Sequence, residues 1–197
     1  MDRRSFLAAT VAASALGFAA PASASEDAAA QLVRSVVDQV VGLIQSGAPR
    51  GQKVSQLRSI MESNVAMRDV AGFALGRYAR GASAQQRDRY VDAYSGYVAR
   101  TYVDRFSEYG GQQIEIVGVK DFGSKGYYVD SRTTYNGQFV NIGWQVRQDR
   151  SGQLKINDIV VDGLSMLESQ RSEFTQMLAG MGGNVDAFID RLNTLGA

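Results

Sequence analysis

The side chains that could do chemistry in this chain of 197 residues are carboxylates, lysine, tyrosine and hydroxyls, because it contains no histidine and no cysteine. These absences exclude zinc sites with His or Cys ligands, haem held by either residue, iron–sulfur clusters, disulfides, thiol nucleophiles and the Ser-His-Asp triad. An enzyme would need carboxylate, Lys, Tyr or hydroxyl chemistry, or a hard metal held by oxygens. The formal net charge is +1, whereas nucleic-acid binders usually carry a basic face. We therefore expect a neutral or amphipathic ligand and no nucleic acid.

Five aspartates lie in or beside the strand-rich part of the chain and could supply a catalytic carboxylate pair. Aspartates scattered in this way are usually turn and edge residues. No nucleophile elbow, P-loop, dinucleotide-binding glycine motif or metal-binding run accompanies them. We therefore predict no catalytic residue, no metal site and no cofactor. The five are Asp121, Asp130, Asp149, Asp158 and Asp162.

Tyrosines gather on the longest predicted helix, which runs from Ser83 to about residue 109. Ser83 and Gln86 have the spacing of a capping box, which favours a helix beginning there. Two interpretations of the tyrosine stripe stay open: ordinary packing against a core, or phenol hydroxyls lining the mouth of a cavity for an amphipathic ligand. Five of the nine tyrosines lie on it: Tyr90, Tyr94, Tyr97, Tyr102 and Tyr109.

The same helix carries four arginines among acidic residues, at positions 87, 89, 100 and 105. Mixed charge of this kind is typical of a solvated face with i,i+4 pairs. A second interpretation places one or two of these arginines beside a phosphate head group or an acidic patch of a partner. Arg87 is our candidate for this role at the cavity mouth or in partner docking.

The elements that position these side chains are helical first, strand-rich next and helical again. Apolar residues spaced three and four apart predict helices over 27–45, 52–64 and 65–77. Four strands are predicted over 112–120, 125–135, 138–148 and 153–162, with Asn136-Gly137 as a two-residue hairpin turn. Two further helices follow, one carrying the stripe that begins at Met166 and one capped by Asn184. The prediction is an α+β fold in which helices cover a four-stranded antiparallel sheet and enclose a hydrophobic cavity.

The first 24 residues have the pattern of an export signal. Arg3 and Arg4 precede an apolar, Ala-rich run that ends in a small-x-small cleavage site after Ala24. The Arg-Arg-x-Phe-Leu order resembles a twin-arginine signal, although general secretory signals also carry paired basic residues. Cleavage would leave a single domain over 25–197 with 19 basic and 19 acidic residues. We expect this neutral domain in the periplasm.

Several segments of the chain resemble a known family over nearly the whole expected domain. They are Leu75-Gly76-Arg77-Tyr78, then Gln86-Arg87 with Tyr90 and Tyr102, then the run from Asp158 to Met166, and finally Arg171-Ser172-Glu173-Phe174. The segment VDGLSM, from Val161 to Met166, is the most specific of these. Together they resemble the periplasmic phospholipid carriers of Mla-type transport, the MlaC or toluene-tolerance family. A related branch is associated with hopanoid lipids.

The resemblance implies a soluble carrier and not an enzyme. Such a carrier would bind phospholipid tails in a hydrophobic cavity between sheet and helices, leaving the head group largely exposed. It would move lipid between an outer-membrane lipoprotein–porin assembly and an inner-membrane ABC transporter with a substrate-capturing ring, which maintains outer-membrane lipid asymmetry. The alternative is an exported small-ligand-binding protein or enzyme on a related scaffold.

The lipid-binding candidates come from two sources. The resemblance places Tyr102 and Leu164 near the cavity mouth. The strand and helix patterns add Phe106, Val129, Val140, Ile142, Trp144 and Val160. Plain core packing is the alternative for each of them, since a lipid cavity is a core with space left in it.

Overall fold

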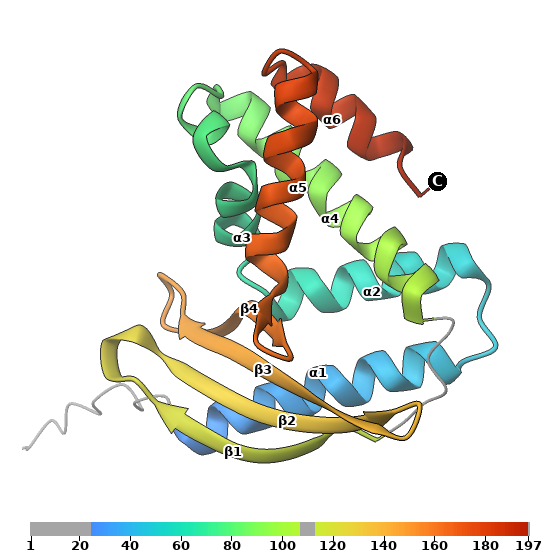
Figure 1. Ribbon diagram of the computed structural model, residues 1–197, viewed down its shortest axis with the longest axis vertical. Helices are drawn as coiled ribbons and strands as arrows, with labels where there is room; N and C mark the ends of the chain where they lie inside the picture. Colours follow the sequence, from blue (N-terminus) through green and yellow to red (C-terminus); the bar gives the residue numbers. More distant parts are fainter. Residues whose placement is uncertain (1–24, 107–112, 197) are drawn as a thin grey trace, which may run out of the picture.

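The computed structural model describes residues 25–106 and 113–196 and confirms the predicted α+β class (Figure 1). Four helical segments precede the sheet and two helices follow it. They are α1 (Glu26–Gln45), α2 (Arg50–Asn64), α3 (Met67–Leu75) with a 3₁₀ turn η1 (Gly76–Arg80), α4 (Ala84–Phe106), α5 (Met166–Gly180) and α6 (Val185–Thr194). Within the described ranges no helix has the length and apolar character needed to cross a bilayer.

The sheet is antiparallel throughout and has the strand order β1-β2-β3-β4-β5. Its strands are β1 (Glu115–Asp121), β2 (Tyr127–Tyr135), β3 (Gln138–Gln148), β4 (Leu154–Val161) and β5 (Leu164–Ser165), with a 3₁₀ turn η2 (Gly123–Lys125) before β2. The Asn136-Gly137 turn is confirmed: both residues have positive φ, and β2 and β3 pair directly on either side of it.

The fifth strand is the difference from the four that the sequence predicts. Asp162 and Gly163 both adopt positive φ and turn the chain back onto β4, so that Val161 pairs with Leu164. A strand of two residues is too short to produce a recognisable alternation of apolar and polar side chains. It is therefore visible only in the structure.

Helix ends follow local capping chemistry. The Ser83–Gln86 box is confirmed, because the Gln86 amide donates to Ser83 Oγ (3.1 Å) and the Ser83 amide donates to Gln86 Oε1 (2.9 Å). The predicted 65–77 helix is divided at Gly76, where φ is +61° and α3 gives way to η1. The predicted extension of α4 to residue 109 lies outside the described residues.

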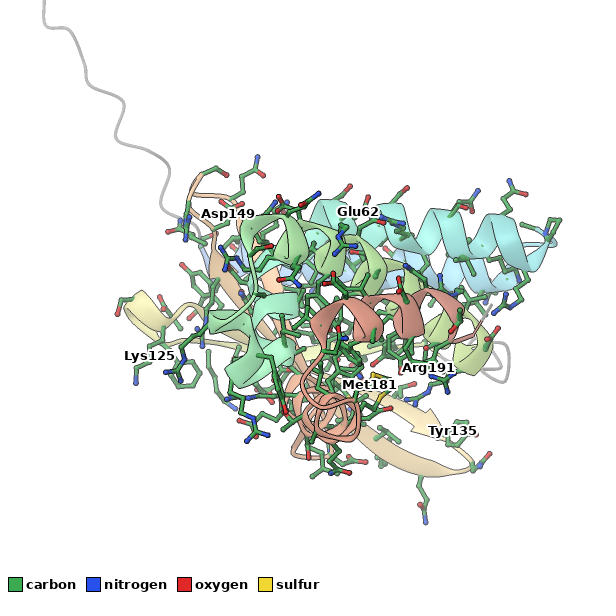
Figure 2. All side chains as sticks on the ribbon, turned by 90° about the horizontal axis from the view of Figure 1, so that it is seen from above. Glu62, Lys125, Tyr135, Asp149, Met181 and Arg191 are labelled. Atoms are coloured by element: carbon green, nitrogen blue, oxygen red, sulfur yellow. The ribbon has the colours of Figure 1, made fainter. Side chains whose placement is uncertain are left out.

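Two hydrophobic cores organise the molecule. In the first, α1 packs along the inner face of the curved sheet, where Ala29 and Val33 lie against Val129 and Val146. In the second, α3, α4, α5 and α6 pack around the fully buried Phe174 and Phe188, above the sheet in Figure 1. Viewed from above, Lys125, Tyr135 and Asp149 lie at or beside turns around the edge of the molecule (Figure 2). The cores therefore build two layers with α2 between them.

The turn before β2 generates a first prediction, because Gly126 (φ +89°) lies against β3. A Cβ at this position would lie 2.3 Å from the Val146 carbonyl oxygen, a main-chain atom that the β2–β3 ladder holds. Gly137 provides a matched control with φ +77° and open space around it. We expect Gly126→Ala to lower the free energy of unfolding by roughly 3 kcal/mol or more, and Gly137→Ala by about 1 kcal/mol. Urea denaturation measures both, and equal losses would contradict the clash.

Candidate functional site

A cavity of about 310 Å³ lies between the inner face of the sheet and the helical layer. Helices α1 and α2 contribute Val36, Val37, Val40, Ile44, Leu57 and Met61 to its wall. The sheet contributes Ile142, Trp144, Ile156, Ile159 and Val161, and Ile114 lies in the wall just before β1. The remaining helices contribute Met67, Val70, Tyr94, Val98, Tyr102 and Leu167. The interior is therefore almost entirely hydrocarbon.

Burial separates the floor of the cavity from its rim. Leu57 (3% exposed), Trp144 (7%) and Ile156 (2%) are among the buried residues and form part of the floor. Tyr102, Ile114, Ile142, Val161 and Gln170 are only partly buried. These partly buried residues of α4, the sheet side and the beginning of α5 form part of the rim.

A buried hydrogen-bond chain fixes the tryptophan of the floor. Trp144 Nε1 donates to Ser131 Oγ (2.9 Å), and the same hydroxyl donates to the carbonyl of Ile142 (2.9 Å). Ser131 is 2% exposed, so that water cannot replace it as the partner of the indole. These hydrogen bonds satisfy the only polar side-chain atom of Trp144 and hold its ring against the cavity.

The polar groups of the wall are few, and its carboxylate has a structural role. Asp158 accepts hydrogen bonds from the amides of Ile159 (2.8 Å) and Leu167 (3.0 Å) and from Ser165 Oγ (2.6 Å). The Leu167 amide is one of the free donors of the first turn of α5, so the contact stabilises the helix terminus. Asn157 places a buried side-chain oxygen beside it that has no hydrogen-bond partner. The carboxylate in the cavity wall thus serves mainly to position α5.

The tyrosine stripe divides between the two interpretations. Tyr90 and Tyr97 pack with Phe188 and Phe174 in the helical core. Tyr94 and Tyr102 also line the cavity, and burial raises the pKa of both phenols above the ordinary value. Both side chains are therefore neutral at physiological pH. Tyr109 lies outside the described residues.

The predicted lipid-binding residues are not all brought together. Tyr102, Ile142 and Trp144 line the cavity. Val129 is fully buried next to Trp144, in the core that α1 forms with the sheet. Phe106 ends α4, and its side chain lies outside the described part of the chain.

The remaining candidates lie away from the wall. Val140 is partly buried near the β2–β3 turn, and Val160 pairs with Gly143 on the outer face while its neighbour Val161 lines the cavity. Leu164, directly opposite Val161, is 70% exposed. Arg87 is exposed at the start of α4 and donates to the carbonyl of Ala82.

Sequence reasoning missed the share that α1 and α2 have in the wall. Val36, Val37 and Leu57 lie on stripes that predict amphipathic helices. An apolar stripe has the same pattern whether it meets side chains or an empty space. No feature of the sequence distinguishes the two cases.

The other four aspartates of the strand region have structural partners. Asp149 accepts from the amides of Ser151 and Gln153, and Asp130 pairs with Lys120. Asp121 accepts from the Gly123 amide and Asp162 from the Asn141 amide. No group of three or more acidic residues that could hold a metal ion occurs among the residues that the structure describes.

Comparison with known proteins identifies the family. The family model described as MlaC protein matches residues 34–194, which is most of the chain. The chain belongs to the MlaC family. A curated member is the intermembrane phospholipid transport system binding protein MlaC of Haemophilus influenzae, 24% identical over 172 residues that cover 82% of this chain and 78% of that protein.

A solved structure agrees with the MlaC fold described above. It is a phospholipid-binding protein from Ralstonia solanacearum in complex with a phospholipid, with a TM-score of 0.68 and 21% sequence identity. The match covers 84% of this chain and 95% of that one. The shared architecture therefore extends over both layers.

The hydrogen bond between Trp144 and the Ser131 hydroxyl leads to a prediction with a matched control. Ser131→Ala leaves the indole N–H buried without a partner, so we expect the free energy of unfolding to fall by about 1–3 kcal/mol. Ser95 is equally buried (2%), but its hydroxyl donates only to the Val91 carbonyl of its own helix. Ser95→Ala should therefore cost little. Chemical denaturation of both variants checks this, and equal stabilities would contradict it.

Proposed function

We propose that this MlaC-family protein is a periplasmic carrier that binds phospholipid by its acyl chains in the cavity between sheet and helices. The observation that carries the proposal is the composition of the wall. Apart from two tyrosines, Asn157, Asp158 and Gln170, every lining residue is aliphatic, methionine or tryptophan. Such a wall suits hydrocarbon, and it gives a polar ligand few partners.

The physical need for a carrier follows from the cost of exposing a lipid tail. At ~0.8 kcal/mol per CH₂, an acyl chain of roughly 15 methylenes costs on the order of 12 kcal/mol to hold in water. Unassisted transfer through an aqueous compartment is therefore slow. A carrier has to hide the tails but has no need to bind the head group tightly.

The finer proposal concerns partners and contact residues. We propose transfer between an outer-membrane lipoprotein–porin assembly and an inner-membrane ABC transporter complex with a substrate-capturing ring, as the family resemblance implies. Tyr102, Ile142 and Trp144 would contact the tails, and Leu164 would lie at the mouth. Arg87, exposed on α4, would contact a head group or a partner.

A small-ligand binder or an exported enzyme on the same scaffold is the alternative function. It would need polar groups that converge inside the cavity. The wall carboxylate, Asp158, is engaged by three donors that belong to the chain itself. This arrangement favours the carrier, and the mass of the bound lipid separates phospholipid from a hopanoid.

The binding of phospholipid can be tested by introducing a carboxylate at the rim of the cavity. The protein purified from the periplasm should contain phospholipid, found by extraction and mass spectrometry. Ile142→Glu should reduce the bound lipid about tenfold or more, because a carboxylate in an apolar wall opposes tail entry. Asn141→Glu is the matched control, since Asn141 is exposed and pairs with Arg132 in the β2–β3 ladder. Wild-type protein without lipid would contradict the proposal.

The same assay tests the predicted mouth residue. Leu164→Glu should lower lipid content while the far-ultraviolet circular dichroism stays unchanged, because Leu164 is exposed beside the rim residue Val161. Normal lipid content in this variant would remove Leu164 from the site.

The proposed export signal can be tested by replacing its paired arginines. Replacing Arg3 and Arg4 together with lysine should abolish periplasmic accumulation if the twin-arginine route is used. Immunoblots of periplasmic and cytoplasmic fractions measure the outcome, with the mature amino terminus at Ser25 in the wild type. Undiminished export of the double variant would indicate the general secretory route.

A further inference from the structure

A second apolar pocket, of about 250 Å³, lies at the far end of α1 between α1, α2 and α4. We call it the rear pocket. Its interior is formed by Leu43, Leu57 and Val103, which are all buried in a small core of their own. None of the residues proposed above to contact lipid lines it.

The rear pocket and the main cavity share a wall. Val40, Ile44 and Leu57 line both spaces, so these three side chains lie between them. Leu57 is 3% exposed and belongs to the buried floor of the main cavity. The two hollows are therefore neighbours, and Leu57 lies between them. Displacing its side chain would connect them.

The size of the main cavity gives a reason for this connection. Its volume of about 310 Å³ is at the lower end of the ~300–1,000 Å³ typical of pockets for drug-sized ligands. A phospholipid with two long tails is larger than such a ligand. The rear pocket would supply nearly as much space again.

The polar residues of the rear pocket indicate what it would not bind. Arg50 pairs with both carboxylate oxygens of Asp104 (2.7 and 3.0 Å), and this ion pair lowers the pKa of Asp104. Arg50 also donates to the carbonyl of Gly196. Lys53 Nζ donates to the Ile44 carbonyl (2.8 Å). Both cations thus already have protein acceptors, whereas the buried side chains of Leu43, Leu57 and Val103 offer only hydrocarbon. The arrangement suits the methyl end of a chain better than an anionic head group.

We propose that the rear pocket receives the methyl end of an acyl chain of the bound lipid, and that Leu57 and Val103 determine the chain length that the protein prefers. This inference rests on the proposed lipid-carrier function. A short tail would end before Leu57, while a longer one would displace this side chain and continue toward Val103.

The test is a competition between two tail lengths. The full mature protein, stripped of lipid, is incubated with vesicles of equimolar dimyristoleoyl and dioleoyl phosphatidylglycerol, and the bound lipids are measured by mass spectrometry. Val103→Phe places an aromatic ring in the rear pocket and should lower the ratio of dioleoyl to dimyristoleoyl lipid about tenfold, the effect of losing two buried methylenes. Leu57→Ala should raise the ratio, because it removes the dividing side chain.

Two controls make the result decisive. Val117→Phe introduces the same ring at an exposed residue of β1 and should leave the ratio unchanged. Thermal unfolding shows that each variant is folded; Val103→Phe fills an existing space and remains the deciding variant if Leu57→Ala unfolds. An unchanged ratio in folded Val103→Phe, at normal or at reduced total lipid, would overturn the inference and leave the carrier function standing. Wild-type protein that takes up neither lipid would instead refute the carrier function itself.

Discussion

The structure depends on keeping an apolar space open between two packed cores. An empty cavity forfeits ~24 cal/mol per Å³, so 310 Å³ corresponds to at most on the order of 7 kcal/mol of stability. Native proteins are stable by only about 5–15 kcal/mol. The fold can carry this cost because α1 with the sheet, and α3 to α6 with one another, each bury a complete core on either side of the space.

This division of the core explains what the sequence could and could not predict. Ile142 and Trp144 alternate strictly with polar neighbours on β3, and this period places them on the inner face. Val160 shows the limit of the same reasoning. The pairing of β3 with β4 is irregular between Gln145 and Val146, so strict alternation does not hold along β4. Val161 and not Val160 therefore lines the cavity. Helical stripes such as that of Val36 and Val37 predict burial. Whether the buried face contacts other side chains or a cavity is seen only in the three-dimensional structure.

The hairpin and the caps illustrate a different class of prediction. Asn136-Gly137 and Ser83–Gln86 were predictable because their chemistry is local, within four residues of chain. Asp158 is the opposite case, since its carboxylate binds the Leu167 amide nine residues away and thereby joins the last long strand to α5 at the rim. An acidic residue in an apolar wall is thus accounted for by the helix terminus that it stabilises.

The hydrogen bond from Arg50 to Gly196 spans 146 residues of chain. It places the C-terminal end next to Arg50, which lines the rear pocket together with Asp104. Purification tags and fluorescent fusions at the C terminus would therefore be attached next to a wall of the rear pocket. A label that is meant to leave this pocket undisturbed belongs before α1, which Ser25 caps.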